Sequence, residues 1–103
     1  MKQERDIINE ILLRASERGH RLFRNNSGVA KYPDGSSVKY GVGGTGGSDL
    51  IGWSRDGKFV ALEVKTPGTR TSKEQRAFVD AAHRAGCIAE VVFSADEALA
   101  LLP

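Results

Sequence analysis

The chain has 103 residues, of which 40% are hydrophobic and 27% are charged, and its formal net charge is +2. This length and composition predict one globular domain over residues 1–103 with a modest core. A single cysteine, Cys87, excludes an internal disulfide and a cysteine-based zinc site. No apolar run approaches the ~20 residues that span a bilayer. The first ten residues are too charged for a signal peptide, so we expect a cytosolic protein.

The first half of the chain predicts a helix, a strand and a hairpin. Residues 4–18 have helical periodicity, and their apolar stripe consists of Ile7, Ile8, Ile11, Leu12 and Ala15. Residues 20–25 alternate in polarity as a strand does. Residues 29–32 and 37–40 flank the turn sequence Pro33-Asp34-Gly35, which is typical of a hairpin.

The second half predicts two strands, a helix, a strand and a short last helix. Residues 49–53 and 58–65 are the two strands, and residues 87–93 are the third. Between them, Thr71-Ser72-Lys73-Glu74 matches a capping box. The helix that follows has an expected buried stripe of Phe78, Ala81, Ala82 and Ala85. Because a strand–helix–strand order favours a parallel crossover, we expect an α/β domain with a mixed sheet.

Two opposite charges interrupt the strand at residues 58–65. Alternation places Val60, Leu62 and Val64 on one face, while Glu63 and Lys65 share the other face. A solvent-exposed ion pair would explain this strand taken alone, and such pairs contribute little to stability.

The preceding strand contains Asp49, whose face depends on how the hairpin closes. A two-residue loop would put Asp49 and Glu63 on opposite faces. A three-residue loop over residues 55–57 would place Gly57 where glycine is needed. It would also pair Trp53 with Phe59 and Asp49 with Glu63. We prefer this second register, and a bulge is the alternative that could rescue the first.

Asp49 and Glu63 would then lie opposite each other, with Cβ atoms ~5 Å apart. Two carboxylates this close repel unless a cation lies between them. Hard oxygen ligands suit Mg²⁺ or Mn²⁺. Lys65 would add a positive group on the same face. A metal and an ammonium converging on one point favour a phosphate substrate.

An aspartate, then Glu-x-Lys one strand later, then a helix with glutamine resembles the PD-(D/E)XK nuclease superfamily. Residues 46–50, 62–65 and 75–78 are similar to its VRR-NUC branch, the virus-type replication-repair nucleases. The resemblance runs from the first helix to Leu102. Ser48 stands where the superfamily name has proline, which is not a ligand.

This resemblance implies a restriction-endonuclease-like core with an extra β-hairpin. It implies a structure-selective DNA endonuclease that uses Mg²⁺ or Mn²⁺ in replication or repair, on branched or double-stranded DNA. Stand-alone relatives of this size occur in phages and bacteria and commonly form homodimers. The bacterial cytosol is therefore the expected compartment, whether the gene is bacterial or phage-borne.

The resemblance also implies further site residues. Gln75 is expected at the active site, and the backbone carbonyl of Val64 is expected as a metal ligand beside Asp49 and Glu63. The family carries a glutamate in its first helix, and this chain has two candidates. Glu4 lies on the apolar stripe, whereas Glu10 lies on a mixed face. We prefer Glu4 as the extra acid, although it could instead only decorate the helix start.

Several basic and polar residues could contact DNA. Lys31 and Lys39 lie on the hairpin, and Arg21, Arg24 and Asn26 precede it. A merely soluble hairpin explains the lysines equally well.

Two alternative functions remain in view. A non-catalytic nucleic-acid-binding module with a vestigial metal site would not need opposed carboxylates. A small-molecule α/β domain could use residues 41–46, which match G-x-G-x-x-G. We reject it because the motif leads into a strand rather than a helix. Those glycines more simply let the backbone approach a ligand.

Overall fold

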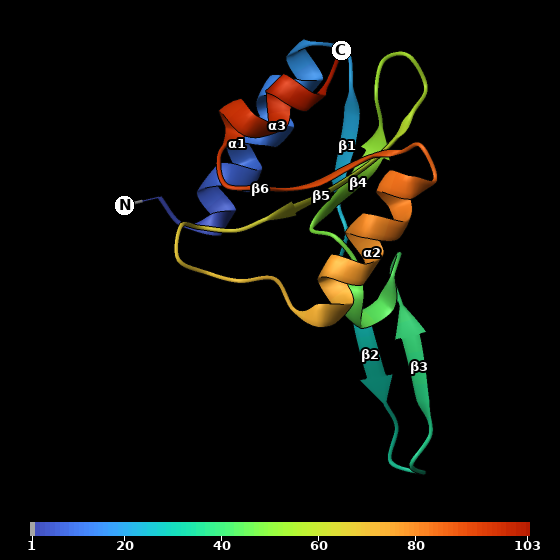
Figure 1. The fold of residues 1–103 in the computed structure, drawn as a ribbon. Coiled ribbons are helices and arrows are strands. Elements are labelled where there is room, and N and C mark those ends of the chain that lie inside the picture. Colours follow the sequence, from blue (N-terminus) through green and yellow to red (C-terminus); the bar gives the residue numbers. More distant parts are fainter. Residues whose placement is uncertain (1) are drawn as a thin grey trace.

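A mixed four-stranded sheet is the centre of the computed structural model, which describes residues 2–103 (Figure 1). Its strand order is β1 (Arg21–Arg24), β4 (Leu50–Trp53), β5 (Phe59–Val64) and β6 (Ile88–Val92). The first three strands pair antiparallel, and β5 pairs parallel with β6. The predicted mixed sheet and parallel crossover connection are therefore confirmed, and the architecture is consistent with a restriction-endonuclease-like core.

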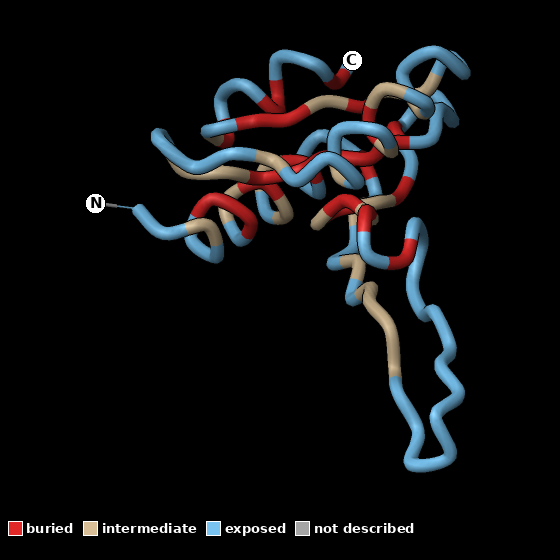
Figure 2. The backbone as a smooth tube through the Cα atoms, turned by 60° about the horizontal axis from the view of Figure 1, so that its bottom comes forward, coloured by how far each residue is buried: buried red, intermediate tan, exposed pale blue. Residues whose placement is uncertain are grey.

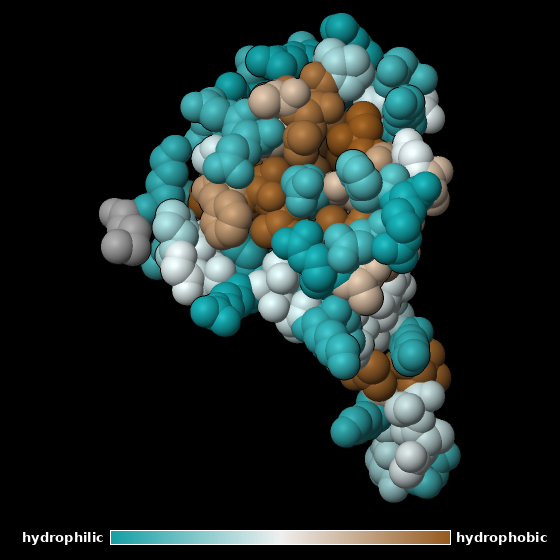
Figure 3. Space-filling view, in the orientation of Figure 1, coloured by the Kyte–Doolittle hydropathy of each residue, from teal (hydrophilic) through white to brown (hydrophobic). Residues whose placement is uncertain are grey.

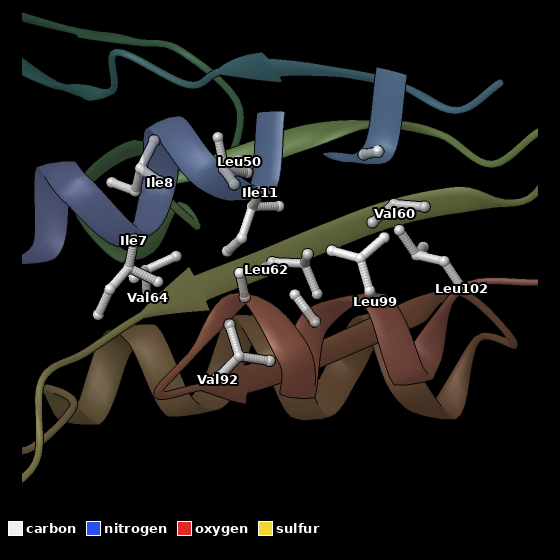
Figure 4. Packing of buried hydrophobic residues seen from close by; sticks show 13 residues of the cluster. Ile7, Ile8, Ile11, Leu50, Val60, Leu62, Val64, Val92, Leu99 and Leu102 are labelled. Carbon is white, nitrogen blue, oxygen red and sulfur yellow. The ribbon is translucent and has the colours of Figure 1, made fainter. Parts of the chain in front are cut away.

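Helices cover both faces of this sheet. Helices α1 (Glu4–Glu17) and α3 (Ala95–Leu101) pack on one face, and α2 (Lys73–Arg84) packs on the other. The larger core lies beneath α1 and α3 (Figure 4), and its largest members include Ile11, Leu50, Leu62 and Leu99. The face predicted to be pure core, with Val60, Leu62 and Val64, is fully buried there. Among residues 2–103, no helix is long and apolar enough to cross a membrane.

Helix α2 departs from its prediction in two details. Its N-cap is Ser72, whose hydroxyl accepts the Gln75 N–H at 3.1 Å, so the capping box is Ser72 with Gln75 rather than Thr71 with Glu74. The buried side chain at the centre of its packed face is Val79, flanked by Phe78 and Ala82. The predicted stripe members Ala81 and Ala85 are exposed. A branched valine buries more apolar area than an alanine, which favours this rotation of the helix.

The predicted hairpin forms a separate two-stranded sheet of β2 (Gly28–Lys31) and β3 (Ser37–Tyr40). It extends away from the body as an arm (Figures 1 and 2), and all of β3 is exposed. Its surface mixes hydrophilic and apolar side chains (Figure 3). A short 3-10 turn, η1 (Gly44–Gly46), leads from the arm back to β4.

Candidate metal and phosphate site

The β4–β5 register decides which side chains can meet at the site. Trp53 pairs with Phe59 and Leu50 pairs with Leu62. The Ser54 N–H donates to the Lys58 carbonyl at 2.9 Å, which closes a three-residue loop. Gly57 has φ +90° within that loop. The predicted register is confirmed, so Asp49 and Glu63 approach each other on the face that carries α2.

The side chains of Asp49 and Glu63 each accept a backbone hydrogen bond from the neighbouring strand. Asp49 lies one residue before β4, where the backbone ladder has ended. Its Oδ2 accepts the Val64 N–H at 2.8 Å, and Glu63 Oε1 accepts the Asp49 N–H at 3.2 Å. These reciprocal bonds fix both carboxyl groups. Each keeps a second oxygen that neither of these two bonds uses.

Glu63 is a buried acid with an unsatisfied oxygen. Its side chain is 1% exposed, and Oε2 has no hydrogen-bond partner within residues 2–103. Lys65 Nζ lies 3.5 Å from this oxygen. Burial, and after it the negative charge of Asp49, raises the pKa of Glu63 to about 7 even though Lys65 opposes the rise. A positive charge beside both acids would offset the cost of burying the Glu63 charge next to Asp49.

The donor set fits a divalent cation. Two carboxylates supply hard oxygen ligands, and one buried oxygen has no hydrogen-bond partner within residues 2–103. Mg²⁺ and Mn²⁺ prefer such ligands. Among residues 2–103, no cluster of three or more His, Cys, Asp or Glu side chains is arranged around one point. Mg²⁺ is usually held by one or two carboxylates and keeps several water or substrate oxygens as ligands.

Asn25 is a positioning residue that lies directly after β1. Its Nδ2 donates to the Val42 carbonyl at 2.7 Å and to the Ser48 carbonyl at 3.0 Å, and its Oδ1 accepts the Val42 N–H at 3.1 Å. Its backbone N–H donates to the Asp49 carbonyl at 2.8 Å. Asn25 thus holds both ends of the glycine-rich loop against β1. An asparagine directly after a strand is the only local signal for this role.

The glycine-rich loop, residues 41–47, packs closely against α2 rather than beside an open ligand site. A Cβ on Gly46 would lie 2.6 Å from the Glu74 carbonyl oxygen, and one on Gly43 would lie 2.9 Å from the Phe78 ring. The expectation that these glycines admit a ligand is therefore replaced by a packing role. They let the chain pass close under α2 and deliver Asp49 to Glu63.

Glu4, Glu10 and Gln75 form no hydrogen bond or ion pair with Asp49 or Glu63 within residues 2–103. Glu10 forms ion pairs with Lys2 at 2.9 Å and Arg14 at 3.0 Å. Glu4 forms no ion pair within residues 2–103 and lies one helical turn before Ile8. The Gln75 side chain accepts the Ser72 N–H at 2.8 Å, so its oxygen is engaged in the capping box.

A hollow of about 360 Å³ opens beside Asp49 and is lined by Ile8, Arg24, Asn25 and Asn26. Arg24 Nη2 donates to Asn9 Oδ1 at 2.6 Å, which holds the guanidinium near α1. Two of the predicted DNA contacts, Arg24 and Asn26, are thus brought together with the acid.

The other predicted DNA contacts lie away from the hollow. Arg21 lies at the opposite end of β1, and Lys31 and Lys39 lie on the arm. Pairing of Val29 with Lys39 and of Lys31 with Ser37 puts the two lysines on one face of that arm.

Comparison with known proteins agrees with this geometry. A family model described as the VRR-NUC domain matches residues 6–96. Neither the curated proteins nor the solved structures contain a match to the chain. The matched segment includes Asp49, Glu63, Lys65, Gln75 and the whole four-stranded sheet.

Proposed function

The chain belongs to the VRR-NUC family, which implies a nuclease of the PD-(D/E)XK type, and from this premise we propose that it is a divalent-metal-dependent DNA endonuclease. The observation that carries the proposal is the acid pair itself. Asp49 and Glu63 are joined by reciprocal hydrogen bonds, and Glu63 keeps a buried oxygen that has no hydrogen-bond partner among the described residues. A domain that only bound DNA would gain nothing from this destabilising arrangement.

PD-(D/E)XK nucleases generally use divalent metals. Asp49, Glu63 and the backbone carbonyl of Val64 would hold Mg²⁺ or Mn²⁺ here. When bound, the ion would polarise the phosphate and favour hydroxide formation from water. Lys65, whose side chain is 15% exposed, reaches the same point with its ammonium group. It would stabilise the negative charge that develops on the phosphoryl oxygens.

Gln75 and Glu4 complete the proposed site. The Gln75 amide nitrogen forms no hydrogen bond within residues 2–103 and is free to orient water or phosphate while the side-chain oxygen caps α2. Residues four apart share one helix face. Glu4 therefore points from α1 to the same side as Ile8, which lines the hollow beside Asp49.

DNA would reach the acids through the hollow and along the arm. Arg24 and Asn26 would contact phosphate beside Asp49, with Lys31, Lys39 and Arg21 further out. We propose branched or double-stranded DNA as the substrate, because an arm and a separate hollow contact phosphates on different segments. Two strands require two acid pairs, so we also propose a homodimer of this single 103-residue domain, acting in the cytosol during replication or repair.

A cleavage panel tests this function. Labelled junction, flap, duplex and single-stranded DNA would be incubated with Mg²⁺, Mn²⁺ or EDTA. We expect metal-dependent internal cleavage of branched DNA and none in EDTA. Folded Asp49→Asn should lose cleavage, whereas Asp34→Asn, which alters an aspartate in the arm's turn, should keep it. Undiminished cleavage by folded Asp49→Asn would contradict the role of the acid pair. Tight DNA binding without cleavage under any condition would favour the vestigial binding module instead.

The same panel decides between the two first-helix glutamates. Glu4→Gln should reduce cleavage more than Glu10→Gln, because Glu10 is already paired with Lys2 and Arg14. Glu10→Gln should instead lower the melting temperature slightly. Greater loss of cleavage in Glu10→Gln would contradict the placement of Glu4 at the site.

A further inference from the structure

Three aromatic side chains share one uncovered area of the sheet. Phe23 in β1, Trp53 in β4 and Phe59 in β5 are 52%, 51% and 38% exposed. Trp53 lies directly opposite Phe59, and the Phe23 and Trp53 ring centroids are 5.7 Å apart at an interplanar angle of 48°. We call these three residues the aromatic platform. Large rings are rarely left exposed together without a partner.

The platform and the acid pair lie on the same face of the sheet, on either side of the part that α2 covers. Side chains alternate along strands, so Asp49, Ile51 and Trp53 share one face of β4. Glu63, Ala61 and Phe59 share that face of β5. Helix α2 covers Ile51 and Ala61 but leaves the platform open. The four residue steps between Asp49 and Trp53 correspond to ~13 Å.

Three cations lie on the turn and the strand next to the platform. The β4–β5 turn carries Arg55 and Lys58, and Arg21 pairs with Trp53 across the strands. Arg21 Nη1 donates to Ser16 Oγ at 3.4 Å, which holds the guanidinium at the edge of the sheet beside α1. These three cations form no ion pair within residues 2–103. Asp56 is the single acid among residues 53–59, and it accepts the Ser54 hydroxyl. The turn lies at the end of the molecule opposite the hairpin arm (Figure 1).

We propose that the aromatic platform stacks the unpaired bases of a single-stranded DNA segment whose backbone continues to the acid pair. Rings bordered by cations match a strand that offers flat bases on one side and phosphates on the other. At ~3.4 Å per nucleotide, about four stacked nucleotides span the ~13 Å to Asp49. The inference rests on the proposed function for the choice of DNA as the ligand. It adds that the substrate contains a segment of unpaired bases.

A second copy of the chain is a weaker occupant for this surface. A two-fold contact places the same patch against itself. The cations that border the platform would then face identical cations with one acid to offset them, which costs free energy. Phosphates instead neutralise them.

The chain supplies its own reporter, because Trp53 is its single tryptophan. We would titrate the protein in EDTA with oligo-dT, with an oligomer of abasic sites of equal length and charge, and with blunt duplex. Stacking should quench or shift Trp53 emission with oligo-dT and leave it nearly unchanged with the abasic oligomer and the duplex. Equal responses to oligo-dT and abasic oligomer would overturn the proposal, since charge alone would then explain binding.

Substitutions separate stacking from other roles. Phe23→Leu keeps apolar area and the Trp53 reporter but removes a ring, and it should weaken oligo-dT binding about tenfold or more. Leu13→Ala, at a 64% exposed leucine on α1, is the matched control and should bind normally. A folded Phe23→Leu protein with unchanged oligo-dT affinity would contradict the inference.

Sedimentation of both variants gives the remaining outcome. A dimer that becomes monomeric in Phe23→Leu but not in Leu13→Ala would assign the platform to self-association and overturn the proposal. The titration needs no catalysis, so failure of cleavage with intact quenching would count against the nuclease alone. Cleavage without quenching would count against the platform alone.

Discussion

At the scale of single residues, the surroundings of Glu63 disfavour its ionised, negatively charged form. Burial and Asp49 raise its pKa from an ordinary 4.5 to about 7. Between these values the folded protein keeps a proton that the unfolded chain releases, so stability falls as pH rises through this window. Above pH 7 the full penalty is present, and a bound cation would relieve it.

We therefore expect Glu63→Gln to stabilise the metal-free protein more at pH 8 than at pH 5. The gain at pH 8 should be on the order of 1–3 kcal/mol, since one pKa unit corresponds to ~1.4 kcal/mol. Thermal unfolding in EDTA measures it. Glu17→Gln, at an exposed position near the end of α1, is the control and should show no pH-dependent gain. An equal effect of Glu63→Gln at both pH values would refute the buried, ionisable carboxylate.

Lys65 is the cation nearest to the Glu63 carboxylate in this site. Its removal takes away a positive charge 3.5 Å from Glu63 Oε2, so a cation would meet less repulsion. Lys65→Ala should bind Mn²⁺ at least as tightly as the unchanged protein, yet lose turnover by a factor of about 100 or more. Calorimetry and cleavage assays test both parts, with Lys31→Ala as the metal-binding control. Much weaker Mn²⁺ binding would give Lys65 a structural role instead.

At the scale of elements, the β4–β5 turn sets the register that joins the acids. Gly57 has φ +90°, and a Cβ there would meet nothing within 4 Å. The penalty for a side chain is therefore conformational. Gly57→Val should destabilise the domain by roughly 1–3 kcal/mol, whereas Gly57→Asn should cost less because asparagine tolerates positive φ. Denaturant unfolding compares them, and equal losses would argue against a strained turn.

The link between β1 and the glycine-rich loop makes a second prediction at this scale. Asn25→Ala removes three side-chain hydrogen bonds to Val42 and Ser48 and should cost roughly 1–3 kcal/mol. Hydrogen exchange at the Val42 amide should accelerate, because its acceptor is gone. Asn26→Ala, at an exposed neighbour without such bonds, should leave stability unchanged. Slow exchange at Val42 in Asn25→Ala would mean that the loop is held by other contacts.

At the scale of the whole molecule, a two-stranded arm extends from a compact body. An isolated hairpin is marginal in water, and this one carries Lys31 and Lys39 on one face. A phosphate backbone along that face would release counterions. In the proposed function, the arm, the hollow beside Asp49 and the aromatic platform would together form a path for DNA.

Replacing both arm lysines should weaken DNA binding without altering stability. In Lys31→Gln/Lys39→Gln, the slope of log K against log salt should fall in magnitude by about 2, because each duplex phosphate contact contributes ~0.9. Binding measured over a salt series gives the slope. Arg18→Gln, at the C-terminal end of α1, should leave it unchanged. An unchanged slope in the double variant would remove the arm from the DNA path.

The sequence by itself determined the elements and the acid pair. Strand alternation separated Val60, Leu62 and Val64 from Glu63 and Lys65. The glycine at position 57 identified a three-residue turn, and the turn determined that Asp49 meets Glu63. These inferences succeeded because they depend on short-range rules, namely side-chain periodicity and the φ that a turn requires.

Only the tertiary structure decided how the elements pack and what they leave open. The rotation of α2 that buries Val79 and exposes Ala81 depends on the sheet beneath it. The bonds of Asn25 depend on a loop that returns 17 and 23 residues later, and Phe23 joins Trp53 only once β1 pairs with β4. Contacts between distant segments depend on which helix and sheet faces are buried against one another. Local sequence patterns do not determine that choice.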